Sequence, residues 1–137
     1  MGLEKLMNTT IVSTELTHSR LKFLGSKFGV TEDIVSRLAL GISIREGKVP
    51  DNWEPKAING KSQIEIATGK SIRGKTLFKN ELPLWVLLLS NVEGQLDSIE
   101  AIRSKFIVHW ERGIEMIIRA DDGEDWVHLI SSLVANE

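Results

Sequence analysis

The sequence predicts a mainly all-α protein, a compact helical domain of about five helices with a long basic connector and room for one short strand or hairpin. Apolar residues recur at three- and four-residue spacing in several stretches, which favours amphipathic helices. Capping residues precede these stretches, and glycine or proline follows them. A length of 137 residues fits one domain. We expect residues 1–12 to be a flexible lead-in and residues 13–137 to form a single helical domain.

The first expected helix begins after Ser13 or Thr14, either of which can cap free backbone N–H groups with its hydroxyl. It ends at Gly29, because glycine readily adopts the left-handed conformation that closes a helix. A short turn then leads into the next helix, so the two should form a hairpin. The stripe that we expect to be buried consists of Leu16, Phe23, Leu24 and Phe28.

The second expected helix, residues 31–46, is the centre of the fold. Thr31 is its N-cap, Gly47 closes it, and Pro50 follows because proline cannot extend a helix. Leu40 and Ile44 fall outside the main apolar stripe, so the helix should be covered on two sides, by the core or by a subunit contact. The main stripe comprises Ile34, Val35, Leu38, Ala39 and Ile42.

The later elements are less regular. Residues 62–68 alternate polar and apolar side chains, which predicts one short strand or extended arm. A third helix over about residues 80–91 is apolar on all sides, so we expect it to be buried or at an interface. The capping box Asp97-Ser-Ile-Glu100, with Asp97 as cap, opens a long helix. Gly113 inside that helix predicts close packing against another helix, and residues 125–134 predict a last short helix.

Composition excludes several classes of function. The chain contains no cysteine, which rules out disulfides, thiolate zinc sites and persulfide chemistry on its own residues. No apolar run approaches the 18 residues of a membrane span, and the N-terminus lacks a signal-peptide core. We therefore expect a cytoplasmic protein that makes no membrane contact. No cofactor or metal is expected.

The net charge of −2 conceals an asymmetry along the chain. Residues 56–79 contain six basic residues and one acid, a net charge of +5, whereas residues 93–137 contain ten acids and four basic residues, a net charge of −6. A local basic patch attracts polyanions whatever the total charge. The alternative is an ordinary solvated, lysine-rich loop.

One motif points to nucleotides. Gly69-Lys-Ser-Ile-Arg-Gly-Lys-Thr76 fits the phosphate-loop pattern, in which Lys75 would reach the terminal phosphates and Thr76 would hold magnesium. Such a loop must follow a buried strand and open a helix in a parallel sheet. The preceding residues are polar at alternate positions, and Pro83 would interrupt the helix. We keep phosphate-loop-like nucleotide binding as an alternative.

No catalytic constellation can be proposed from spacing. His18, His109 and His128 are scattered without metal-ligand spacing. The acidic run 121–125 lacks the spacing of a calcium loop and is better interpreted as a solvated helix junction. The sequence therefore gives no positive indication of an enzyme.

Three segments in order resemble the DndE family, the small subunit of the DNA phosphorothioation system. They are Arg37-Leu-Ala-Leu-Gly-Ile-Ser-Ile-Arg-Glu-Gly-Lys-Val-Pro50, Lys75-Thr-Leu-Phe78 before an apolar helix, and His109-Trp-Glu-Arg-Gly-Ile114. The resemblance implies a compact helical homotetramer that binds DNA and works beside other Dnd proteins, which mobilise sulfur and exchange it for a non-bridging phosphate oxygen. The missing cysteines agree, since partners would have to carry the sulfur.

On this interpretation the chain is a DNA-binding, oligomeric scaffold subunit whose basic residues contact the DNA backbone with little sequence preference. The residues expected to contact phosphate are Lys22, Lys27, Lys70, Arg73, Lys75 and Lys79, with Arg20 behind them. Arg37 and Glu46 match the family motif and are expected in structural ion pairs. A module that binds only proteins is a second alternative, and a nicking nuclease would need magnesium-binding carboxylates beside the basic patch.

Overall fold

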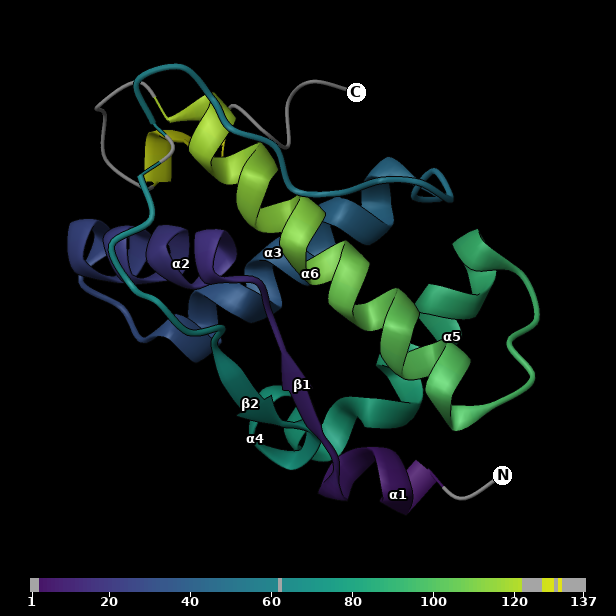
Figure 1. The fold of residues 1–137 in the computed structure, drawn as a ribbon. Helices are drawn as coiled ribbons and strands as arrows, with labels where there is room; N and C mark the ends of the chain where they lie inside the picture. The colour runs from purple at the N-terminus through teal and green to yellow at the C-terminus, as the bar shows by residue number, and fades with distance from the viewer. Residues whose placement is uncertain (1–2, 62, 122–126, 130, 132–137) are drawn as a thin grey trace.

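A computed structural model describes residues 3–61, 63–121, 127–129 and 131 (Figure 1). Over residues 3–121, residue 62 apart, the fold is mainly helical, as predicted, with one small two-stranded sheet. No helix in this part is both long and apolar enough to cross a membrane. The elements are α1 (Leu3–Asn8), β1 (Thr10–Val12), α2 (Glu15–Phe28), α3 (Glu32–Glu46), β2 (Ser71–Arg73), α4 (Gly74–Phe78), the 3-10 helix η1 (Lys79–Glu81), α5 (Leu82–Glu93) and α6 (Ile99–Ala120).

The crossing of α3 and α6 forms the centre of the molecule (Figure 1). A Cβ atom built on Gly113 would lie 1.9 Å from the carbonyl oxygen of Ala39, so only glycine allows the two backbones to approach this closely. One turn earlier, Trp110 is fully buried and its Nε1 donates a 2.9 Å hydrogen bond to Ser36 Oγ. The close packing expected at Gly113 is confirmed.

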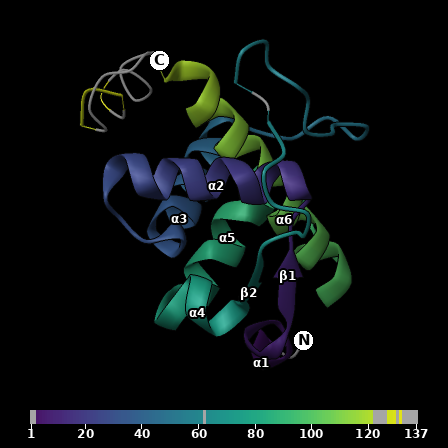
Figure 2. The ribbon, with the colours of Figure 1, turned by 60° about the vertical axis from the view of Figure 1, so that its left-hand side comes forward.

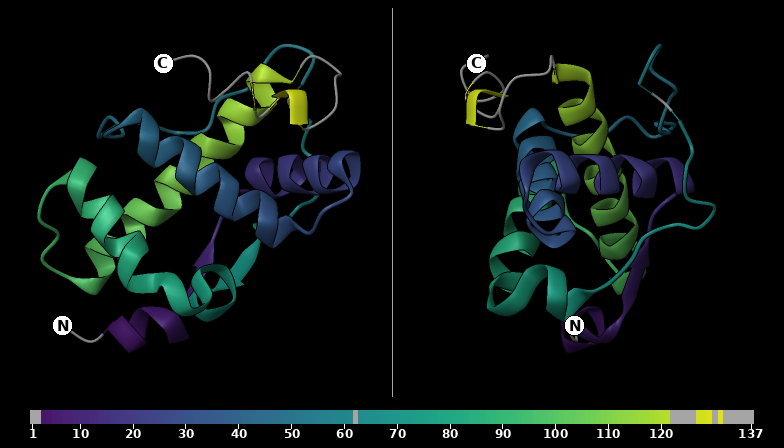
Figure 3. Two further views of the ribbon diagram at one scale, coloured as in Figure 1. Left: turned by 180° about the vertical axis from the view of Figure 1, so that it is seen from behind. Right: turned by 90° about the vertical axis from the view of Figure 1, so that its left-hand side faces the viewer.

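The remaining elements flank this crossing on two sides. Helix α2 covers one part of the α3–α6 pair, while α1, α4 and the strands lie toward the opposite end (Figures 2 and 3). In the core, the ring centroids of Phe78 on α4 and Phe106 on α6 lie 4.6 Å apart. The central position predicted for residues 31–46 is confirmed, since Val35, Ala39, Leu40 and Ile44 are all buried.

The start of the chain differs from the expected lead-in. Residues 3–12 contain α1 and β1, with Leu6 and Ile11 in the core. Strand β1 pairs antiparallel with β2, and Ile11 lies opposite Ile72. A segment this short has no long apolar periodicity that would indicate a helix. Strand β1 depends on its pairing with β2, which is distant in the sequence.

Of the short strand or extended arm expected at residues 62–68, the strand is wrong: residues 63–68 form neither strand nor helix and are mostly exposed, and the strand lies at Ser71–Arg73. The backbone N–H groups of Glu65 and Ile66 donate instead to Ser19 Oγ on α2, both at 3.1 Å. A side-chain acceptor thus takes donors that a strand would present to a neighbour. This part of the connector, the segment of residues 47–70 between α3 and β2, therefore lies along α2.

Helix boundaries follow the capping residues closely. Thr14 caps α2 and Thr31 caps α3, and Gly29 ends α2 at a φ of 68°. The cap of α6 is Ser98, whose hydroxyl accepts from the Ala101 N–H at 3.0 Å, rather than the predicted Asp97. The serine stands one residue closer to the helix, where its oxygen reaches the free N–H groups.

Two residues assigned to buried stripes are exposed. Phe23 on α2 and Ile34 on α3 both face solvent, because neighbouring residues on each helix carry the packing. The last expected helix, residues 125–134, falls mostly outside the described residues; within it, Leu129 is buried against the core.

Candidate nucleic-acid interface

The phosphate-loop lookalike, Gly69–Thr76, is built into the sheet. The N–H of Gly74 donates to the Thr9 carbonyl at 2.9 Å, and Lys70 and Ser13 exchange two hydrogen bonds of 2.9 Å. A Cβ on Gly69 would lie 1.8 Å from the Ser13 carbonyl oxygen. These glycines therefore serve close packing, and the N–H groups of Lys70 and Gly74 are engaged, whereas a phosphate loop keeps its N–H groups free to cradle phosphates. The geometry does not support the nucleotide-binding alternative.

The same segment presents basic side chains to solvent. Arg73 points outward from β2, whose middle residue Ile72 points into the core. Lys75 on α4 and Lys79, the residue that follows α4, are both exposed. Lys22 on α2 is also exposed. None of these four forms an ion pair with a described residue. We call Lys22, Arg73, Lys75 and Lys79 the outer cations.

Lys22 lies one turn after His18 on α2. His18 Nδ1 donates to the Thr68 carbonyl at 2.8 Å, just before β2. This side of α2 therefore adjoins the segment that carries the other outer cations. Lys70 lies at the junction, where its Nζ forms a 3.3 Å ion pair with Glu32 at the start of α3.

The other two predicted contacts occupy different surroundings. Lys27 forms an ion pair with Asp121 at the end of α6 and keeps about a fifth of its side chain exposed. Arg20 is only 2% exposed, donates to Glu115 at 3.2 Å and also donates to the Lys56 carbonyl. Its burial and its carboxylate partner give Arg20 a structural role, so we do not include it among the phosphate contacts proposed below.

Several acids of the C-terminal third face the interior. Glu111 accepts from the Thr14 N–H and from the hydroxyls of Thr14 and Thr17, at 2.7 to 2.9 Å, which places a negative charge at the N-terminus of α2. Glu115 accepts from Arg20 and from the Lys56 N–H. The surface is consequently less acidic in this region than the charge count along the chain suggests.

A buried polar network between α3, α5 and α6 was not predicted from the spacing of residues in the sequence. Ser43 Oγ lies 2.8 Å from His109 Nδ1, and His109 Nε2 lies 2.8 Å from Glu93 Oε2. The ionised Glu93 carboxylate can only accept, so Nε2 of the neutral His109 donates to it and Nδ1 accepts from the Ser43 hydroxyl, which in turn accepts from Arg112 Nε at 2.9 Å. The histidine proton then lies on Nε2 and is donated to Glu93. Neither the order Ser, Glu, His nor its spacing gives a recognisable signal in the sequence.

This serine–histidine–acid arrangement is structural. Ser43, His109 and the Glu93 side chain are all fully buried, so a substrate could not reach the hydroxyl. Arg112 closes the site further by donating to backbone carbonyls of Ser43 and Lys48 near the end of α3.

Burial and charge set the proton affinities of this network. Burial lowers the pKa of His109, and the nearby Arg112 and Lys105 lower it further against the opposing effect of Glu93. For Glu93, burial raises the pKa, but hydrogen bonds from the Val49 N–H and His109, with the charge of Lys105, outweigh it and leave the pKa lowered. Burial also lowers the pKa of Arg112. The favoured state is neutral His109 beside ionised Glu93.

A second surface feature is apolar. On α5, Leu84, Leu87 and Leu88 are exposed, and Leu87 is 66% accessible. Their spacing of three and four residues places them on one side of the helix. For the helix expected to be buried or at an interface, full burial is therefore found only at Leu82 and Leu89 on α5, and the exposed leucines leave the interface as the remaining expectation.

Two further expectations have structural outcomes. Arg37 donates to the Leu77 carbonyl at 3.3 Å, so it is structural through a backbone acceptor. Glu46 is exposed at the end of α3, where its negative charge raises the pKa of Arg112 and so opposes the lowering caused by burial. Within the described residues, no group of three or more histidine, cysteine or acidic side chains is arranged to hold a metal ion.

Comparison with known proteins gives one family and one fold. Residues 11–124 match the family model described as DNA sulphur modification protein DndE. A solved structure, that of DndE from Escherichia coli B7A involved in DNA phosphorothioation modification, superposes with a TM-score of 0.58 at 21% identity, covering 79% of this chain and 94% of that one. Curated protein sequences gave no match.

Proposed function

Because the chain belongs to the DndE family, we propose that it is a DNA-binding, oligomeric scaffold subunit of the DNA phosphorothioation machinery. The observation that carries this proposal is the set of outer cations, which lack a carboxylate partner among the described residues. The proposed phosphate contacts are Lys22, Arg73, Lys75 and Lys79, with Lys70 and Lys27 beside them.

Contact through these side chains would be directed at the DNA backbone. Lysine ammonium groups act as point charges toward phosphate. Backbone contact positions a protein without reading the sequence of bases. We therefore expect little sequence preference, and an affinity that falls steeply as salt displaces the released counterions.

Self-association is the second part of the proposal. The exposed leucines of α5 form an apolar stripe of the kind that marks an interaction surface. A second copy of the chain carries the same stripe, so an isologous contact through α5 would cover both. That contact builds a dimer, and the homotetramer that the family resemblance implies would need a second, different interface between two such dimers. Leu84→Glu with Leu87→Glu should lower the mass measured by light scattering.

Partner proteins complete the proposal. With no cysteine in the chain, sulfur must be mobilised on other Dnd proteins. A subunit that binds both DNA and its own copies would hold the DNA beside those proteins. We assign no bond-making or bond-breaking step to this chain.

The experiment is a fluorescence-anisotropy titration of full-length protein with fully paired, nicked and single-stranded DNA over a salt series. Arg73→Ala/Lys75→Ala is compared with Arg45→Ala/Lys48→Ala, which removes the same number of positive charges from the C-terminal end of α3 and the residues just after it. The proposal expects salt-sensitive binding that the first variant weakens by about tenfold or more and the second leaves unchanged.

Three outcomes would contradict this proposal. Equal losses in both variants would point to non-specific charge attraction. No binding to any DNA would favour the protein-interaction module. Hydrolysis of ATP with Mg²⁺ in a parallel set would restore the nucleotide-binding alternative.

A further inference from the structure

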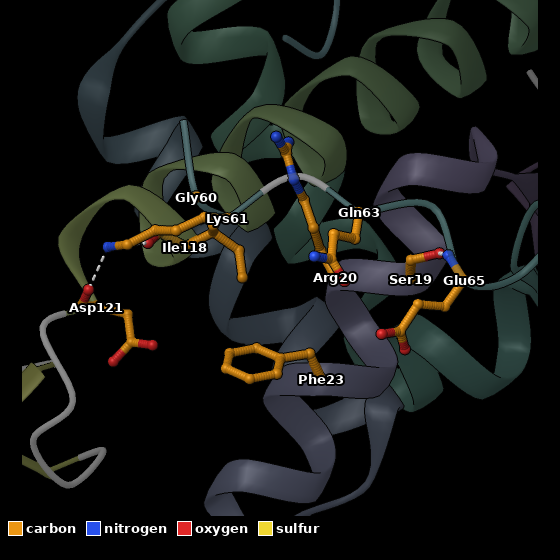
Figure 4. A pocket seen from close by; sticks show the side chains of 9 residues that line it. All are labelled: Ser19, Arg20, Phe23, Gly60, Lys61, Gln63, Glu65, Ile118 and Asp121. Atoms are coloured by element: carbon orange, nitrogen blue, oxygen red, sulfur yellow. Dashed lines mark hydrogen bonds between the residues drawn. The ribbon is translucent and has the colours of Figure 1, made fainter. Parts of the chain in front are cut away.

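A cavity of about 540 Å³ lies between α2, the connector and the end of α6 (Figure 4). This volume falls within the range of about 300 to 1,000 Å³ typical of small-ligand sites. Its lining comes from three parts of the chain. The lining residues include Ser19, Arg20, Phe23, Lys61, Gln63 and Glu65.

Part of this lining is fixed by internal bonds. Lys61 Nζ donates to the carbonyl oxygens of Ile118 and Asp121, and Ser19 Oγ accepts from the connector backbone. Arg20 is held by Glu115. These bonds tie the connector to α2 and α6 and make the cavity a built feature of the fold.

Three lining side chains remain available. The Phe23 ring is 52% exposed, although an aromatic ring is costly to leave in water. Gln63 and Glu65 are exposed, and neither side chain forms a bond with another described residue. Figure 4 shows the Phe23 ring on one side of the cavity, with Gln63 and Glu65 on other sides of it. The cavity thus offers a flat apolar platform together with polar groups for the edge of a ligand.

We propose that this cavity receives one unpaired nucleobase of a bound DNA strand, stacked on Phe23 and hydrogen-bonded along its edge by Gln63 and Glu65. The inference rests on the proposed DNA binding and adds a site to it. Base stacking on an exposed aromatic ring is a general mode of single-strand recognition. A base must leave the duplex first, because its ring faces and edges are otherwise covered by stacking and pairing.

The surroundings of Phe23 suit a nucleic-acid strand. Lys22, the preceding residue, is one of the outer cations, and Lys27 lies one turn further along α2. A strand that passes Lys22 would bring its bases to the Phe23 ring. The carboxylate of Glu65 only accepts hydrogen bonds, so it favours guanine, whose pairing edge presents adjacent N–H donors.

The test measures binding of full-length protein to three short fluorescent duplexes: fully paired, with one extrahelical guanine, and with one extrahelical thymine. The wild-type chain should bind the guanine-bulged duplex about tenfold more tightly than the paired one, as expected for one stacked base. Phe23→Leu keeps an apolar side chain at an exposed position and should abolish that difference. Glu65→Gln should abolish the preference for guanine over thymine.

Lys22→Ala is the matched control on the same turn of α2. It should weaken binding to all three duplexes by the same factor, because phosphate contacts are common to them. Circular dichroism should give the wild-type spectrum for every variant.

Several results would overturn the inference. Equal affinity of the wild-type chain for paired and bulged duplexes would contradict the proposed base site but not the proposed function. Equal weakening of all duplexes by Phe23→Leu would assign the ring to general contact. Displacement of bulged DNA by stoichiometric free dGMP would assign the cavity to a free nucleotide. If the protein bound none of the three duplexes, both the proposed function and the proposed base site would be contradicted.

Discussion

The chain uses its basic residues in two opposite ways. The inner cations, Arg20, Lys105 and Arg112, are paired with carboxylates or backbone carbonyls around α6. The outer cations lie on α2 and on the β2–α4 segment without such partners among the described residues. Both groups carry the same charge, so the charge of a segment does not by itself locate a binding surface. What distinguishes them is whether the fold brings an acceptor within reach.

The largest effect is expected from removing an inner cation. Arg112→Met should lower the free energy of unfolding by about 3 to 5 kcal/mol, because buried carbonyls near the end of α3 lose their donor. Urea denaturation measures this loss. The folded fraction should retain the salt dependence of DNA binding. A stable variant with impaired DNA binding would contradict the division between inner and outer cations.

Substitution at the crossing of α3 and α6, which positions the inner cations, should lower the free energy of unfolding by nearly as much. Gly113→Ala places a methyl group where the Ala39 carbonyl oxygen lies and should cost about 3 kcal/mol, since two helix backbones must separate. Gly41→Ala is the control: its nearest neighbour, a Trp85 ring atom, is 4.0 Å away. That change should stabilise α3 by up to about 1 kcal/mol. Thermal unfolding of both variants tests the packing, and equal effects would contradict it.

The buried His109 makes the free energy of unfolding depend on pH. Because the pKa of His109 is lowered in the folded chain, the unfolded chain takes up a proton first as the pH falls below 6.5. Stability should therefore be complete above pH 6.5 and decrease below it, by at most about 1.4 kcal/mol per pH unit. The lowered pKa of Glu93 acts in the same direction, but below pH 4.5.

Urea denaturation between pH 7.5 and 5.5 measures this dependence. His109→Gln should be less stable overall, and its free energy of unfolding should change less over that interval, because the substitution removes the histidine whose pKa is lowered by folding. An equal slope in the two proteins would show that another group titrates.

The comparison also explains which features the sequence could predict. Caps and helix periodicity are local, so the boundaries at Thr14, Gly29, Thr31 and Gly47 were predictable from neighbouring residues. The pairing of β1 with β2 joins segments about sixty residues apart, and no local pattern encodes that partner. Its absence from the prediction left residues 3–12 without assigned structure.

The candidate site divides in the same way. Residues 70–79 were predictable as a basic segment from composition. The pairing of Arg20 with Glu115 was not, because it depends on α2 meeting α6. Phe23 fitted a helical stripe by spacing, yet lies beside a cavity that only the folded connector creates.

The smallest effect concerns an outer cation placed in a strained backbone. Lys79 closes α4 with φ 51° and ψ −128°, a conformation that glycine adopts far more readily than lysine. Lys79→Gly should leave the free energy of unfolding unchanged or raise it by less than about 1 kcal/mol, while lowering the slope of log affinity against log salt by about one. Lys79→Ala should lower the salt slope equally without relieving the strain. Loss of Lys79 should thus weaken DNA binding without lowering stability, whereas loss of Arg112 should lower stability without changing DNA binding. If both variants bound DNA with the wild-type salt slope, Lys79 would not belong among the outer cations that contact DNA.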